Sequence, residues 1–211
     1  MLISISLPPG SHMLRLIVTS AIAIVTAAPA LFGSARAQSF GSSYTSTAEK
    51  DCRITNTGRD GSVSACPGKA GLIVLVTEDD LRQSVSVGRN RKAAENEPAA
   101  GAGFGPFNSA NATVEWRAID GKPFAIIQRW LIADIDAPDK GGHPTDKGLL
   151  VVTRLPPGAV CHVAYVDVAA NPNPNELARK AADEIARDFK CDKDEVQFVG
   201  ARGRAAELAK H

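Results

Sequence analysis

The densest group of potential metal ligands in the sequence lies in one loop. Its candidate ligands are Asp134, Asp136, Asp139 and His143. Carboxylate oxygens suit Ca²⁺, and mixed Asp and His ligands suit Zn²⁺ or another transition metal. The spacing departs from the EF-hand pattern, because Pro138 replaces the third ligand and no glutamate closes the loop. We therefore favour a solvated connection between two strands, with a metal-dependent or hydrolytic enzyme that uses this loop as the alternative.

A second candidate site surrounds Arg129, which lies in the apolar segment 124–133. A strand that is apolar on both faces belongs at the centre of a covered sheet, where a guanidinium needs a partner. Glu115 is the candidate for a structural ion pair, and an anionic ligand is the alternative. Trp116 and Trp130 suit core packing, or a ligand platform if their rings are exposed. Arg129, Trp116 and Trp130 are thus the candidate binding residues.

No catalytic residue is predicted. The motifs G-x-S-x-G, H-E-x-x-H and S-x-x-K are absent from the sequence. Cys161 and His162 are adjacent, but neighbouring residues on a strand point to opposite faces and cannot act as a nucleophile and its base. Nothing in the sequence indicates a cofactor.

The four cysteines are Cys52, Cys66, Cys161 and Cys191. A strand from Cys161 to residue 168 would rise about 23 Å at ~3.3 Å per residue. A helix over 174–190 would return about 24 Å at ~1.5 Å per residue, which brings Cys191 beside Cys161. We therefore expect a 161–191 disulfide, together with a local 52–66 disulfide across a turn-rich loop.

Residues 1–37 have the order of a secretory signal peptide. Arg15 precedes an apolar run over 16–32, and an A-x-A cleavage site ends at Ala37. Translation could begin at Met13, and an uncleaved membrane anchor is the alternative to cleavage. Cleavage removes two arginines and no acidic residue, which turns the formal charge of +1 into about −1. We therefore expect an oxidising location, periplasmic or secreted, with no nucleic-acid partner and no membrane span after cleavage.

The remaining pattern predicts strands followed by one main helix. Strands are expected over 71–77, 83–88, 114–118, 124–133, 148–155, 159–168 and 196–199. Residues 120–121 and 156–158 supply turns between strands. Asn173, Pro174 and Glu176 start a helix with an apolar stripe that ends near residue 190. The expected fold is α+β, with a mostly antiparallel sheet of five to seven strands, one C-terminal helix packed on it, and two disulfides.

The expected layout is a flexible leader over 38–50, a single α+β domain over 51–200 and a polar tail over 201–211. Within the domain, 89–105 is expected to be a long surface loop. The favoured function is non-enzymatic binding of an unknown small molecule or envelope protein after export. Besides the enzyme named above, a protein inhibitor that presents the exposed 89–105 loop is an alternative.

Overall fold

The computed structural model describes residues 38–57 and 61–210, and the side chains of all of these except 55–57. The expected signal peptide therefore lies outside the described residues. The strands are β1 (Phe40–Ser46), β2 (Arg53–Thr57), β3 (Gly61–Pro67), β4 (Ile73–Asp79), β5 (Arg82–Gly88), β6 (Asn108–Ile119), β7 (Lys122–Asp134), β8 (Thr145–Arg154), β9 (His162–Asp167) and β10 (Gln197–Phe198). The helices are α1 (Arg91–Glu95), α2 (Pro174–Ile185), α3 (Arg204–Leu208) and two 3-10 turns, Glu49–Asp51 and Pro98–Gly101. In this described part, no helix has the length and apolar character needed to span a membrane.

The predicted α+β class with five to seven antiparallel strands is wrong, because the described chain is mostly β. Its strands form a ten-stranded mixed sheet in the order β10-β9-β8-β7-β6-β5-β4-β3-β2, with β1 paired to β6 outside this path. The pairs β9–β10 and β5–β6 are parallel. Among the described residues, the longest helix is α2, with 12 residues. The missed strands β1, β2 and β3 are rich in Ser and Thr, and pairing with neighbouring backbone rather than an apolar pattern specifies them.

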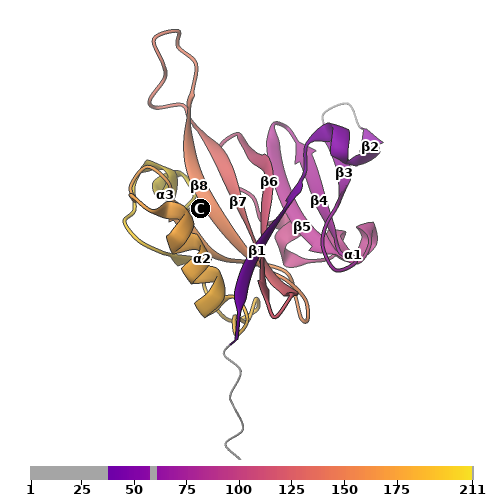
Figure 1. Ribbon diagram of the computed structural model, residues 1–211. Coiled ribbons are helices and arrows are strands. Elements are labelled where there is room, and N and C mark those ends of the chain that lie inside the picture. Colours follow the sequence, from indigo (N-terminus) through magenta and orange to yellow (C-terminus); the bar gives the residue numbers. More distant parts are fainter. Residues whose placement is uncertain (1–37, 58–60, 211) are drawn as a thin grey trace, which may run out of the picture. The chain divides into compact units, whose positions relative to one another are not determined.

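Strand β6 pairs with different strands along its length. β5 and β6 pair at one position, Arg82 with Asn108. β1 instead pairs with β6 over seven consecutive positions, from Phe40 opposite Ile119 to Ser46 opposite Thr113. Figure 1 shows β1, in indigo, lying along β6, with β2–β5 to one side and β7–β8 to the other. The N-terminal strand is thus the neighbour of β6 on the side away from β7.

Strands β6–β8 are covered on both faces, as the apolar pattern of 124–133 predicted. On one face, Ile126, Trp130 and Ile132 of β7 share a core with residues of β3, β4, β5 and β8. On the other face, Ala125 and Ile127 belong to a second core with α2. The α2 residues of that core are mostly alanines, whose small side chains let the helix approach the sheet closely. In Figure 1, α2 lies in front of β8.

The hairpin between β6 and β7 forms at the predicted turn. Asp120 and Gly121 have positive φ angles of 47° and 77°. Turns with two positive φ angles match the right-handed twist of antiparallel strands, and Gly and Asp tolerate this conformation. The hairpin is longer than predicted, since β6 and β7 extend to Asn108 and Asp134.

Both predicted disulfides are confirmed. Cys52 bonds to Cys66 of β3, with 4.2 Å between the Cα atoms. Cys161, just before β9, bonds to Cys191, which follows α2, with 5.8 Å between the Cα atoms. The second bridge forms because α2 runs back along β9, so that its end returns to the start of the strand. In the chain-entropy model, closing these loops contributes about 3–4 kcal/mol per bridge.

Three segments for which the sequence predicted no definite strand or helix contain regular structure. Phe40–Ser46, within the expected leader, forms β1, and Arg204–Leu208, within the expected tail, forms α3. The 89–105 segment holds α1 and a 3-10 turn, and its Ala94 and Ala99 are fully buried. Gly88 permits this packing, because a Cβ there would lie 2.5 Å from the Ala94 nitrogen. Ala94 and Ala99 therefore serve close packing, while other residues of this segment, among them Asn90, Glu95 and Pro98, are exposed.

Candidate functional site

A pocket of about 300 Å³ opens beside the N-terminal half of α2. Five elements contribute to it, and its lining residues are Tyr44 (β1), Asn111, Thr113 and Glu115 (β6), Ile127 and Arg129 (β7), Leu150 (β8), and Asn175 and Arg179 (α2). Polar side chains form most of this lining, and two of them are arginines. The volume lies at the lower end of the range for small-molecule sites.

An irregularity in β6 shapes the pocket. Ala110 pairs with Trp130 and Val114 pairs with Gln128, so three β6 residues between them lie opposite a single β7 residue, Arg129. The amide nitrogen of Gln128 donates to the Asn111 carbonyl oxygen over 2.7 Å and holds the bulge in place. Bulges of this kind redirect side chains next to functional sites. Here the bulge leaves Arg129 without a paired residue on β6.

Arg129 is partly buried, and its side chain makes no hydrogen bond or ion pair with any residue in the described part of the chain. It lies on the same face as Ile127 and beside Leu150, its register partner on β8. The expected ion pair with Glu115 is not formed, since Glu115 lies opposite Ile127 and binds other groups. A partly buried guanidinium loses hydration, and this loss is only partly offset when no anion is nearby.

Glu115 instead orients Arg179. Its carboxylate accepts hydrogen bonds from Nε and Nη2 of Arg179, over 2.6 and 3.1 Å, and from the Ser42 hydroxyl. These hydrogen bonds raise the pKa of Arg179 above its usual range. Glu115 is 8% exposed, so the carboxylate is a buried anchor for the helix residue. Two arginines and one glutamate give the pocket a formal charge of +1.

A second ion pair fixes α2 next to this group. Arg117 donates from Nε and Nη2 to the two carboxylate oxygens of Asp183, over 3.0 and 2.6 Å, and from Nη1 to Ser42. The side chain of Arg117 is 8% exposed. Such two-pronged pairs hold a fixed geometry as well as a charge. The Arg179–Glu115 and Arg117–Asp183 pairs therefore attach α2 to β6 and leave Arg129 as the pocket's unpaired cation.

The two tryptophans proposed as binding residues lie elsewhere. Trp116 and Trp130 are 0% and 1% exposed, in the core between the sheet halves. The indole nitrogen of Trp116 donates to Thr45 over 2.7 Å, and Trp130 packs edge-on against Phe104. Protein atoms surround both indole rings, so neither ring presents a surface to which a ligand could bind.

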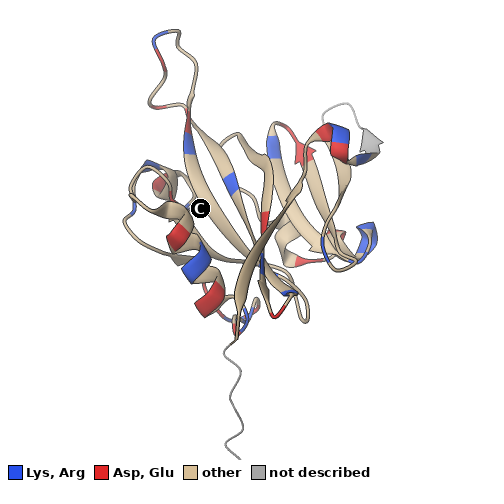
Figure 2. Cartoon of the chain, in the orientation of Figure 1, with Lys and Arg blue, Asp and Glu red and all other residues tan. Residues whose placement is uncertain are grey.

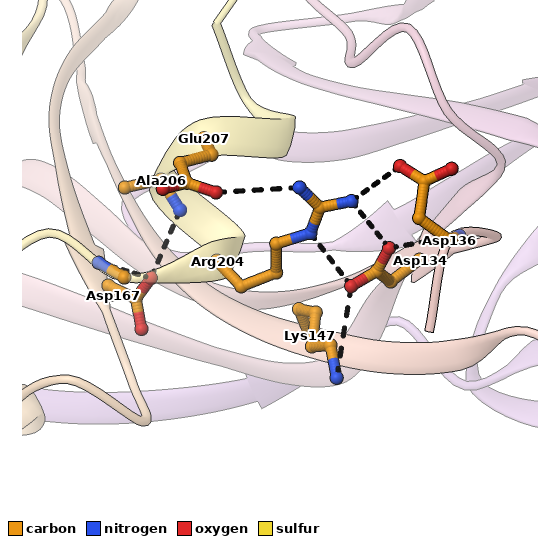
Figure 3. A network of polar contacts seen from close by, with 8 residues as sticks. Asp134, Asp136, Lys147, Asp167, Arg204, Ala206 and Glu207 are labelled. Carbon is orange, nitrogen blue, oxygen red and sulfur yellow. Dashed lines mark hydrogen bonds and ion pairs between the residues drawn. The ribbon is translucent and has the colours of Figure 1, made fainter. Parts of the chain in front are cut away.

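The acidic loop does not bring its four candidate ligands together. Arg204 of α3 donates to both oxygens of Asp134, over 2.8 and 2.7 Å, and to Asp136 over 2.7 Å. Figure 3 shows this guanidinium between the two carboxylates, with Lys147 also beside Asp134. The hydrogen bond from Arg204 lowers the pKa of Asp134. Asp134 thus anchors α3 through a cation that the protein itself supplies.

The other two candidate ligands stabilise the loop itself. One oxygen of Asp139 accepts hydrogen bonds from the backbone nitrogens of Gly141 and His143, over 2.8 and 3.0 Å. This is the local pattern by which an aspartate stabilises a turn. Across residues 38–57 and 61–210, no group of three or more His, Cys, Asp or Glu residues is placed to hold a metal ion.

The adjacent Cys161 and His162 also have structural roles. Cys161 is in a disulfide, and His162 is 4% exposed among Phe104, Trp130 and Tyr165. A hydrogen bond of 2.9 Å joins its Nδ1 to the Tyr165 hydroxyl. Burial lowers the pKa of His162 to about 4, so the ring is neutral at physiological pH.

Sequence reasoning identified Arg129 but missed its surroundings. Arg179 appeared only as part of a helix, and Tyr44 lay in the supposed leader. Residues 111–113 lay outside the predicted strand 114–118, so no feature of the sequence indicated the bulge in β6. In the view of Figure 2, acidic and basic residues are interspersed over the strands and α2 without a broad region of one sign. Comparison with protein-family models, curated proteins and solved structures found no match to this chain.

Proposed function

We propose that the protein binds a small carboxylate-bearing monoanion in the pocket between α2 and β6–β7. The observation that carries this proposal is the partly buried, unpaired guanidinium of Arg129 at the pocket wall. An entering carboxylate would accept two parallel hydrogen bonds from that guanidinium, a geometry that arginine favours. It would also compensate for the hydration that Arg129 loses in the folded chain.

The rest of the lining supports a singly charged ligand. The Arg179–Glu115 pair is internally neutral, so the excess charge is the single positive charge of Arg129. Asn111, Thr113 and Asn175 supply side chains that can donate or accept hydrogen bonds. A doubly charged phosphate would carry one charge more than the pocket neutralises. The pocket therefore favours a carboxylate over a phosphate dianion.

The same contacts favour binding over catalysis. Glu115 is the pocket's carboxylate, and its oxygens already accept three hydrogen bonds from Arg179 and Ser42. A carboxylate occupied in this way is poorly placed to contact a substrate. The function supported best is thus that of a non-enzymatic binding protein.

The experiment is isothermal titration of the disulfide-intact protein with sodium butyrate and with inorganic phosphate, in a chloride buffer. We expect saturable butyrate binding that weakens about 10-fold or more in Arg129→Gln, since a hydrogen bond to a charged group contributes about 1.5–3 kcal/mol. Arg89→Gln removes the same charge from an exposed position between β5 and α1 and serves as the matched control. Equal butyrate affinity in wild type and Arg129→Gln would exclude the proposed site.

We also propose that the protein acts after export to the periplasm or the extracellular space. The support is the signal-like order of residues 1–37 together with two disulfides, which persist in oxidising compartments. The intact mass of the recovered protein tests this. We expect a chain beginning at Gln38 that is lighter by two hydrogens for each disulfide. A chain that retains residues 1–37 would contradict the proposal.

A further inference from the structure

A second, more open hollow of about 200 Å³ lies farther along β7 than the pocket around Arg129. Residues 127, 129, 131 and 133 of a strand point to the same face. Ile127 and Arg129 line the first pocket, and Leu131 and Ala133 line the second. At ~3.3 Å per residue, Leu131 and Ala133 lie about 7 Å and about 13 Å along the strand from Arg129. The two hollows are therefore successive parts of one sheet face.

Four of the seven residues that line the second hollow are Leu, Phe or Ala, whereas only Ile127 and Leu150 are aliphatic among the nine that line the first. Leu81 and Phe107 line it together with Leu131 and Ala133, and they are unusually exposed for their size, at 61% and 41%. An exposed group of large apolar side chains indicates a binding surface. Arg82 lies over the Phe107 ring, 4.9 Å from its centre, and holds the ring at the edge of the hollow.

Two small residues flank Leu131 on the neighbouring strands. Ser109 is the register partner of Leu131 on β6, and Gly148 is its partner on β8. Because Gly148 has no side chain, Val168 packs against that position, 3.3 Å from where a Cβ would lie. Asp146, opposite Ala133, places an acidic group at the far end. The path therefore runs from a cation, over apolar side chains, to a carboxylate.

We propose that the ligand is an amphipathic carboxylate of medium chain length, with its head at Arg129 and its aliphatic chain over Leu131 and Ala133 toward Phe107. This inference rests on the proposed function, because it uses the same Arg129 site for the head. Charge complementarity sets the orientation, since the carboxylate is attracted by Arg129 and repelled by Asp146. The distance of about 13 Å along β7 limits the chain to a medium length.

The test compares octanoate with butyrate by isothermal titration of the disulfide-intact protein. Butyrate reaches only the head site, whereas octanoate also covers the apolar path. Each methylene that leaves water strengthens binding by up to about fourfold. We therefore expect octanoate to bind at least about 10-fold more tightly than butyrate, even though the hollow is shallow.

Two serine variants test whether the apolar side chains cause this gain in octanoate affinity. Phe107→Ser and Leu131→Ser should lower octanoate affinity about fivefold or more and leave butyrate affinity unchanged. Ile54→Ser is the matched control, because Ile54 is also exposed and apolar but lies on β2, away from the path. Phe107 is an exposed residue, so its variant keeps the test valid if Leu131→Ser does not fold.

The outcomes separate the two proposals. Equal binding of butyrate and octanoate, both lost in Arg129→Gln, would overturn the apolar path and retain the anion site. Octanoate binding that is unchanged in Arg129→Gln would overturn the head assignment and this inference. Butyrate binding that is also unchanged in that variant would overturn the proposed function as well. An octanoate preference that Phe107→Ser and Leu131→Ser leave intact would place the chain elsewhere and overturn this inference alone.

Discussion

Replacing Arg129 with methionine should stabilise the ligand-free protein. Arg129 is partly buried and unpaired. Its guanidinium therefore loses hydration in the folded chain, and no ion pair offsets this loss. Methionine keeps a long flexible chain over Ile127 and Leu150 but removes the charge. Full burial of an ion costs several kcal/mol, and partial exposure reduces this cost. We expect Arg129→Met to raise the free energy of unfolding by about 1 kcal/mol, within the range of stabilising substitutions at functional sites.

Arg117→Met is the matched comparison on the next strand. Arg117 is a similarly placed arginine, but it is paired through two hydrogen bonds with Asp183. Removing one partner leaves the other charge uncompensated, at a cost of about 3–5 kcal/mol for buried pairs. Asp183 is partly exposed, with 21% of its side chain accessible, so the lower end applies. We expect Arg117→Met to lower the free energy of unfolding by about 3 kcal/mol.

The assay is urea unfolding followed by tryptophan fluorescence, which both buried tryptophans report. Equal m-values would show that the variants expose the same amount of surface on unfolding, so that their free energies of unfolding can be compared directly. Saturating butyrate should stabilise the wild type and not Arg129→Met, because a ligand that binds only the folded state adds to its stability. Loss of more than about 1 kcal/mol in Arg129→Met would refute the reasoning, since it would mean that Arg129 has a stabilising partner in the free protein.

Two further predictions concern the framework. His162 has a pKa lowered to about 4 by burial, whereas an unfolded histidine titrates near ~6.5; between these values the unfolded chain binds the extra proton. Stability should therefore fall as the pH drops from about 6.5 to about 4, by roughly 3 kcal/mol in total, and urea unfolding of His162→Phe should show a flatter profile over the same pH range. Replacing Cys161 and Cys191 together with serine should lower the free energy of unfolding by about 3–4 kcal/mol, because the bridge closes a loop of 30 residues. A change below about 1 kcal/mol in the same urea assay would show that the packing of α2 alone holds the helix to β9.

The sequence pattern predicted the parts of the fold that local chemistry specifies. The turn at Asp120-Gly121 and the start of α2 at Pro174 follow from residue types that suit one backbone conformation. The Cys161–Cys191 bridge followed from matching a strand length to a helix length. The strand 124–133 was correctly placed at a centre covered on both faces, because it is apolar on both faces.

The parts that failed depend on contacts between distant segments. β1 is a Ser/Thr-rich strand whose backbone pairs with β6, some seventy residues away, so its own sequence carries no strand pattern. Arg204 forms ion pairs with Asp134 and Asp136 from the C-terminal end of the chain, which no spacing within the loop indicates. The partner of Glu115 was misassigned because the β6 bulge shifts the register and α2 brings Arg179 to it.

The most direct test of the central claim is an NMR titration that follows the guanidinium Nε–H signal of Arg129 during addition of butyrate. The account predicts a saturable shift of the Arg129 signal, a smaller shift at Arg179 and none at Arg89. A shift at Arg89 equal to that at Arg129, or no saturable shift at Arg129 at millimolar butyrate, would contradict a carboxylate site in this pocket.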